Sequence, residues 1–178
     1  LKEYKKNIML IYGEMLGGIW KDFMFKDDLK QGESLEMYLL NKIHIGNTPI
    51  FGEPCPDAYK MQGYFKYYDI WIPEFGVAVE VKGDKKSLET GNFLIEVEMG
   101  GKPSALSTTK AQYWVFYDGE YEIWTTPDRI RQAVKGLPLR DILGRGDSTW
   151  KKGYLPTKNQ IKKYAEFIIP DNYYAIHS

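Results

Sequence analysis

The sequence contains very little cysteine and histidine. Of its 178 residues, only Cys55 is a cysteine, and His44 and His177 are the two histidines. A single cysteine cannot form an internal disulfide, so we expect a reducing, intracellular location such as the cytoplasm. The same shortage excludes zinc sites that are built from clusters of cysteine and histidine.

Long apolar runs and an excess of one charge are also missing. The apolar stretch 8–25 is interrupted by Glu14, Lys21 and Asp22, so we expect neither a signal peptide nor a membrane partner. Its apolar residues recur at helical spacing, which predicts one helix or two short helices. Because 24 basic residues balance 24 acidic ones, the overall charge gives no argument for an anionic partner.

The distribution of charge is less even than its total. The segment 129–163 contains ten basic residues but only two acids, Asp141 and Asp147, which gives it a formal charge of about +8 and leaves about −8 for the rest. This segment is either a phosphate-binding surface or the solvated face of a helix. Lys151 and Lys152 are the candidates for DNA binding that we take from it.

The stretch 67–83 has the pattern of a β-hairpin. Two apolar and aromatic runs flank the turn 73–76, and a four-residue loop there pairs Ile72 with Val77. Continuing this register places Asp69 opposite Glu80 and Tyr67 opposite Lys82. Because side chains alternate along a strand, the carboxylates of Asp69 and Glu80 and the amine of Lys82 are expected on one face.

Two carboxylates at this spacing repel each other unless a cation lies between them or one of them keeps its proton. Hard oxygen ligands with room for water suit Mg²⁺, so Asp69 and Glu80 are candidate metal ligands. Lys82 would stand beside the metal, where metal and amine together lower the charge of a scissile phosphate. The residues therefore favour metal-assisted hydrolysis of a phosphodiester. The alternative is a solvated hairpin face.

This arrangement resembles the PD-(D/E)XK nuclease superfamily. The matching signature is Asp69, ten residues, then Glu80-Val81-Lys82 at the end of an apolar strand. The resemblance implies that Asp69 and Glu80 bind Mg²⁺, for which Mn²⁺ would substitute, and that Lys82 orients or deprotonates the attacking water.

A predicted helix over 32–40 extends this resemblance. In members of the Holliday-junction-resolvase type, the first core helix opens with glycine and carries a metal-binding glutamate four residues later, a spacing that Gly32 and Glu36 match. The resemblance adds Glu36 to the catalytic and metal-binding residues, with Glu33 as the less favoured candidate. The alternative is an ordinary solvent-facing glutamate.

The segment 90–115 contains Thr90-Gly91-Asn92, then Ile-Glu-x-Glu, Gly-Lys-Pro-Ser and Thr-x-Ala-x-Tyr-Trp-Val. With these motifs it resembles small phage-type endonucleases of the same superfamily. A strand over 93–98 is expected beside 77–82, where Glu96 or Glu98 would overlook the metal or would serve as an edge salt-bridge partner. The hydroxyl-rich loop 100–112 leads into a predicted short helix that would cradle a phosphate. Its candidate DNA-binding residues are Lys102, Ser104, Thr109 and Lys110. Ala105 stands where we expect glycine.

The fold class that follows is α/β with a restriction-endonuclease-like core, in which a central mixed sheet of four or five strands is flanked by helices. An Asp118-Gly119 turn joins two of the strands, and capping signals at Thr126 and Thr157 begin helices, the second ending near 169. Within one overall domain, we expect an N-terminal helical segment (1–28), the nuclease core (29–136) and a loop-rich basic extension (137–178).

The predicted activity is Mg²⁺-dependent cleavage of DNA by an endonuclease, with a phage-encoded homing or other site-specific enzyme as the first reading. A structure-selective resolvase of the Holliday-junction type and a non-catalytic nucleic-acid-binding protein with a nuclease-like fold are the alternatives. An interaction protein that uses its aromatic surface is a further one. Cutting both strands of a duplex favours a homodimer or a higher symmetric assembly. A phage-encoded enzyme would work in the host cytoplasm.

Overall fold

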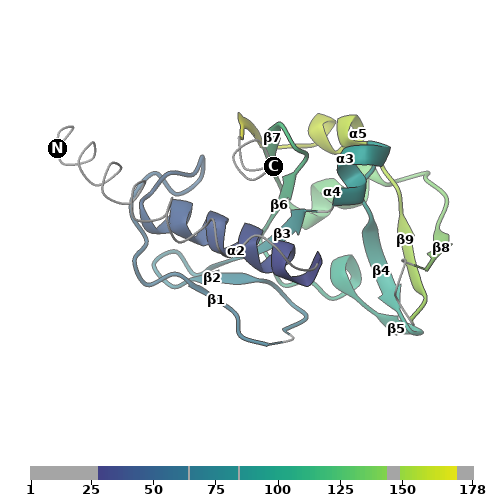
Figure 1. Cartoon of the computed structure of the whole chain (residues 1–178), viewed down its shortest axis with the longest axis horizontal. Coiled ribbons are helices and arrows are strands. Elements are labelled where there is room, and N and C mark those ends of the chain that lie inside the picture. The colour runs from purple at the N-terminus through teal and green to yellow at the C-terminus, as the bar shows by residue number, and fades with distance from the viewer. Residues whose placement is uncertain (1–27, 64, 84, 144–148, 172–178) are drawn as a thin grey trace.

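The computed structural model describes residues 28–63, 65–83, 85–143 and 149–171. The helix predicted within 8–25 lies outside these ranges. Most described elements belong to two β-sheets, with short helices between the strands (Figure 1). The general α/β class expected from the sequence is therefore confirmed.

The first sheet is mixed and has the strand order β1-β2-β3-β6-β7-β10. Strands β3 and β6 run parallel, and the other neighbours are antiparallel. The expectation of four or five strands was too low because the short edge strands carry little sequence signal. The strands are β1 (Tyr59–Lys60), β2 (Ile70–Ile72), β3 (Val77–Gly83), β6 (Tyr113–Tyr117), β7 (Tyr121–Thr125) and β10 (Phe167–Pro170).

A second, antiparallel sheet has the order β5-β4-β9-β8. The expectation that the strand near 93–98 lies beside 77–82 was wrong, because β6 occupies that position. The segment 137–156, expected to be loop, contributes two polar strands: β9 pairs with β4, and β8 pairs with β9. The strands are β4 (Ile95–Met99), β5 (Lys102–Pro103), β8 (Arg140–Ile142) and β9 (Lys151–Tyr154).

The helices are mostly short, and their starts follow the capping signals. Thr126 accepts a hydrogen bond from the Arg129 backbone N–H, and Thr157 and Gln160 form a reciprocal capping box. The last helix ends at Lys163 rather than near 169, because β10 pairs with β7 instead. The helices are α2 (Asp28–His44), α3 (Lys85–Thr90), the single turn η1 (Ala105–Ser107), α4 (Pro127–Ala133) and α5 (Lys158–Lys163).

Helix α2 lies across one face of the first sheet (Figure 1). Its stripe of Leu35, Leu39 and Ile43 is fully buried, as the sequence predicts, and packs in one core cluster with Val79 and Val81 of β3. Each such side chain contributes about 1.5–3 kcal/mol on burial. The helix is also joined to the sheet by an ion pair between Lys42 and the fully buried Glu122.

The opposite face of the first sheet forms a second core cluster. Ala78, Trp114 and Phe116 from the sheet pack there with Ile95 of β4 and Ile130 of α4. Since β4 belongs to the second sheet, this cluster joins the two sheets. The alternation along β3 therefore turns the odd-numbered valines toward α2 and the even-numbered residues toward the second sheet.

Candidate active site

The β2–β3 hairpin positions the predicted acids. Its register pairs Ile72 with Val77, as the sequence predicts, and continues to Ile70 and Val79. The ladder then stops, because the Asp69 backbone N–H donates to the carbonyl oxygen of Val79 at 3.0 Å. The expected backbone pairing of Asp69 with Glu80 was therefore wrong, because the Asp69 N–H bonds to Val79, one residue before Glu80.

The Asp69 side chain takes over where the ladder stops. Its Oδ2 accepts a hydrogen bond of 2.7 Å from the backbone N–H of Val81. The carboxylate is therefore held against β3 between Glu80 and Lys82. Tyr67 has already left the hairpin, because its carbonyl oxygen accepts the backbone N–H of Lys110, so it does not pair with Lys82 as expected.

Glu80 and Lys82 form an ion pair on β3. The Glu80 side chain is 11% exposed, and that of Lys82 is 32% exposed. Lys82 Nζ lies 5.1 Å from the ring centroid of Trp114, the residue opposite Glu80 on β6. Burial alone would lower the pKa of Lys82, but the charges of Glu80 and Asp69 outweigh burial and raise it above its usual range. The amine is therefore a cation at neutral pH.

Asp69 is held in an environment that disfavours its charge. Burial, and then repulsion from Glu80, raise the pKa of Asp69 to about 7, against the attraction of Lys82 and the hydrogen bond from Val81. Two acids and one amine thus interact strongly at the end of the hairpin. This is the convergence that the sequence pattern predicts for Asp69, Glu80 and Lys82.

Glu36 does not join this group as a third ligand. Its carboxylate forms an ion pair of 2.7 Å with Lys60 of β1, and its charge is the weakest of the named influences on Asp69. Among the residues that the structure describes, no group of three or more His, Cys, Asp or Glu side chains is arranged to hold a metal ion. The side chain of Glu33, the other candidate, lies outside the described set.

The two carboxylates nevertheless suit a hard divalent cation. Asp69 Oδ1 makes no hydrogen bond within the described part of the chain, and Glu80 offers a second carboxylate beside it. The repulsion that raises the Asp69 pKa is the kind that a cation relieves. Mg²⁺ is commonly held by one or two carboxylates, with water and phosphate oxygens completing its coordination.

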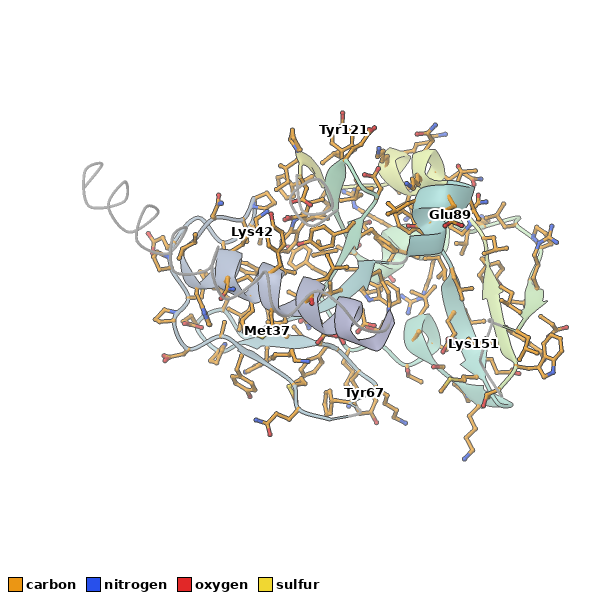
Figure 2. The ribbon with its side chains drawn as sticks, viewed as in Figure 1. Met37, Lys42, Tyr67, Glu89, Tyr121 and Lys151 are labelled. Carbon is orange, nitrogen blue, oxygen red and sulfur yellow. The ribbon has the colours of Figure 1, made fainter. Side chains whose placement is uncertain are left out.

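The second sheet adds charge near this site. Glu96 of β4 contributes to the raised pKa of Lys82 and pairs with Lys151 across the strands at 3.9 Å. Figure 2 shows the Lys151 side chain on this sheet. Glu98 pairs with Lys152 at 3.2 Å. Both predicted DNA-binding lysines of β9 are thus engaged by carboxylates of β4, and DNA contact by them stays a prediction.

The expected phosphate cradle is not a helix terminus, because η1 is a single turn. The Ser104 side chain makes no capping hydrogen bond, and Lys102 is exposed on β5. Thr109 Oγ1 accepts a hydrogen bond from Trp114 Nε1 at 3.2 Å, and Lys110 Nζ lies 4.4 Å from the ring centroid of Tyr67. Thr109 therefore supports the ring beneath Lys82, and Lys110 remains exposed.

Sequence reasoning did not identify three neighbours of the site. Lys60 engages Glu36, Trp114 lies beneath Lys82, and Lys66 lies 5.1 Å from the Tyr67 ring centroid. The position of Trp114 depends on parallel pairing of β3 with β6, across more than thirty residues. No local pattern signals that pairing, although a lysine followed by two tyrosines at 66–68 is a visible sign of a basic aromatic surface.

Comparison with known proteins adds no relative. A scan against family models and searches of curated proteins and solved structures found no match to this chain. The resemblance to PD-(D/E)XK nucleases therefore stays an inference from the residues quoted above. Within the described ranges, no helix is long and apolar enough to cross a membrane.

Proposed function

We propose that the protein is a metal-dependent endonuclease that hydrolyses phosphodiester bonds of DNA. The observation that supports this most is the convergence of Asp69, Glu80 and Lys82. Lys82 is paired with Glu80, and the Asp69 carboxylate accepts a hydrogen bond from the backbone N–H of Val81, the residue between them. Paired carboxylates next to a positioned amine suit hydrolysis of a substrate that carries negative charge at the reacting atom.

Each side chain has a distinct role in this proposal. Asp69 and Glu80 would hold Mg²⁺ or Mn²⁺, which when bound supplies positive charge to the scissile phosphate. The ion pair with Glu80 fixes the Lys82 amine at the site, where it orients the attacking water and stabilises charge that develops at phosphorus. The Trp114 ring beneath Lys82 restricts the amine further. Cutting both strands of a duplex requires two such sites, which favours a homodimer.

Plasmid nicking tests the proposal. Supercoiled plasmid should be nicked with Mg²⁺ or Mn²⁺ and not with EDTA. Lys82→Ala and Glu80→Gln should each reduce the rate on the order of 100-fold or more, because the first removes a positive charge at the reacting phosphate and the second removes a ligand of the metal that would supply one. Lys163→Ala, at an exposed lysine of α5, is the matched control and should leave the rate unchanged. Nicking that survives Lys82→Ala would refute the assignment.

A nucleic-acid-binding protein that does not cut is the second candidate. The ion pair between Glu36 and Lys60 favours this candidate, because it engages the carboxylate that was expected as the third metal ligand. Salt-dependent DNA binding without cleavage at any divalent ion would establish this reading. If cleavage occurs, a panel of duplex, four-way junction, flap and single-stranded substrates separates a site-specific enzyme from a resolvase.

A further inference from the structure

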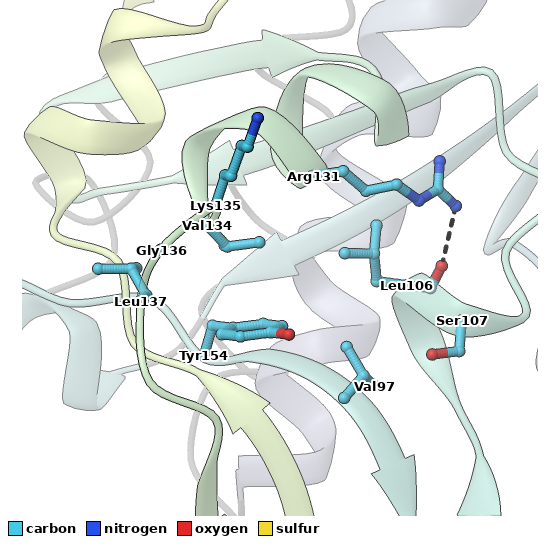
Figure 3. Close-up of a pocket in the computed structure, with 9 residues that line it drawn as sticks. All are labelled: Val97, Leu106, Ser107, Arg131, Val134, Lys135, Gly136, Leu137 and Tyr154. Atoms are coloured by element: carbon cyan, nitrogen blue, oxygen red, sulfur yellow. Dashed lines mark hydrogen bonds between the residues drawn. The ribbon is translucent and has the colours of Figure 1, made fainter.

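A cleft of about 590 Å³ opens between the end of α4 and the second sheet (Figure 3). Its volume lies within the range of about 300–1,000 Å³ that is typical of ligand sites. The proposed catalytic residues do not line it. Its lining combines apolar side chains, one aromatic ring and two cations, from the residues Val97, Leu106, Ser107, Arg131, Val134, Lys135, Gly136, Leu137 and Tyr154.

The floor of the cleft is apolar and includes the ring of Tyr154. Tyr154 ends β9 and pairs with Ile95 of β4. The strands approach closely at the preceding residue, since a Cβ on Gly153 would come within 2.6 Å of the Ile95 carbonyl oxygen. Figure 3 shows the Tyr154 ring lying between Val97 and Val134. A flat ring in an apolar cleft is a surface on which a nucleobase stacks.

The rim of the cleft is cationic. Arg131 donates to Asp128 Oδ1 at 2.7 Å and to the Leu106 carbonyl oxygen at 3.2 Å, which fixes its guanidinium at the mouth. A guanidinium has five N–H donors, so others remain for a phosphate. Lys135 is exposed and has no ion-pair partner among the described residues, and the exposed Ser107 adds a hydroxyl.

A second cleft adjoins this rim. It has a volume of about 490 Å³ and shares Arg131 with the first cleft. Thr109 and Lys110 line it, and Thr109 bonds the Trp114 ring that lies beneath Lys82. Lys135, Arg131 and Lys110 thus place cations along the two clefts, and the carboxylate of Asp128 also lines the second.

We propose that the first cleft binds one unpaired nucleotide of a nucleic-acid strand, with its base on Tyr154 and its phosphate at Arg131 and Lys135. The inference rests on the proposed nucleic-acid substrate and names its class: a strand with a base outside the helical stack. A base can enter a cleft of this kind only when it is unpaired and unstacked. The cationic rim selects a phosphate over an uncharged ligand.

Binding of duplexes with and without one unpaired 2-aminopurine tests the proposal. The full chain carrying Lys82→Ala is used without divalent ions, so that no cleavage occurs. The bulged duplex should bind about 10-fold or more tightly than the matched duplex, because base–aromatic stacking has that magnitude. Its fluorescence should fall on binding, as the base stacks on the ring.

Variants locate the base. Tyr154→Leu should bring the affinity ratio close to one, whereas Tyr154→Phe should retain it. Tyr59→Leu, at a half-exposed tyrosine of β1, is the matched control. Ser107→Phe blocks the mouth without touching the core and should also abolish the preference, which keeps the test decisive if Tyr154→Leu fails to fold. If the affinity ratio of the bulged to the matched duplex is unchanged in both Tyr154→Leu and Ser107→Phe, the proposal is overturned.

Two further results separate this inference from the proposed function. Cleavage by the unmodified protein, together with equal binding of both duplexes, would leave the nuclease in place and remove the nucleotide site. Tighter binding of the bulged duplex that depends on Tyr154, without cleavage at any divalent ion, would support the nucleotide site and refute the nuclease. Free deoxynucleoside monophosphate should compete more weakly than unlabelled bulged duplex for binding of the labelled duplex. Equally strong competition at the same concentration would overturn the assignment of the cleft to a strand.

Discussion

Lys82 forms its ion pair with Glu80, the same carboxylate that repels Asp69. The amine therefore neutralises part of the charge at the site, but the repulsion between the acids persists. Their spacing and mutual repulsion could be predicted because strand alternation is strict, whereas the burial that contributes most to the raised Asp69 pKa depends on the assembled sheet. Ion binding and pH should both act on this pair.

The first prediction concerns Asp69→Asn and pH. The folded pKa near 7 exceeds the ordinary value of 3.8, so the folded state binds more protons between these values, and stability falls as pH rises through this window. Asn carries no such charge. Urea unfolding should find the variant more stable than the unmodified protein at pH 7, by about 2 kcal/mol after allowance for solvent screening, and equal to it near pH 4.

Two controls accompany this measurement. Asp141→Asn, which removes a carboxylate from an exposed residue of β8, is the matched control. Addition of Mg²⁺ at pH 7 should stabilise the unmodified protein and not Asp69→Asn, because the ion would relieve the repulsion. A difference at pH 7 no larger than that at pH 4 would contradict the raised pKa.

Ala105 carries a second prediction about a single residue. Its φ of 41° lies in the left-handed region, where a Cβ costs about 1–2 kcal/mol, and the family resemblance leads us to expect glycine there. Ala105→Gly should therefore stabilise the protein by about 1 kcal/mol in urea unfolding, the relief of strain exceeding the entropic cost of glycine. A destabilised variant would show that the Ala105 methyl group packs well enough to offset the strain.

At the scale of elements, the sequence predicts a structure correctly where one short segment contains all the residues that interact. The capping box at Thr157, the turn 73–76 and the buried stripe of α2 depend on residues within a few positions of each other. Strands β8 and β9 lack alternation, and β9 is held by pairing with β4, far earlier in the chain. The sequence could not place β6 beside β3 for the same reason.

Gly153 tests how closely the two central strands of the second sheet must approach. A Cβ there would meet the Ile95 carbonyl oxygen at 2.6 Å and Leu94 Cδ1 at 2.9 Å. Gly153→Ala should force β9 away from β4 and destabilise the protein by about 1–3 kcal/mol. Gly52→Ala is the control, since nothing lies within 4 Å of its Cβ. Equal unfolding midpoints for the two variants would show that β9 shifts freely.

At the scale of the whole molecule, the charge imbalance of the sequence largely disappears. Of the nine basic residues of 129–163 that the structure describes, five form ion pairs with acids from outside this segment. The expected broad basic surface is therefore replaced by a narrower set of cations along the two clefts. This basic track consists of Lys110, Arg131 and Lys135 on the clefts, together with Lys66, which lies over the same Tyr67 ring as Lys110.

The salt dependence of DNA binding measures how many cations contact phosphate. Each contact contributes about −0.9 to the slope of log K against log [salt], so the basic track predicts a slope of about −3 to −4 for the Lys82→Ala protein. Ten contacts from the basic segment would give about −9. The double variant Lys110→Gln/Lys135→Gln should reduce the slope by about 2, whereas the exposed pair Arg140→Gln/Lys163→Gln should not. A slope near zero would contradict every nucleic-acid reading, because binding without counterion release involves no phosphate.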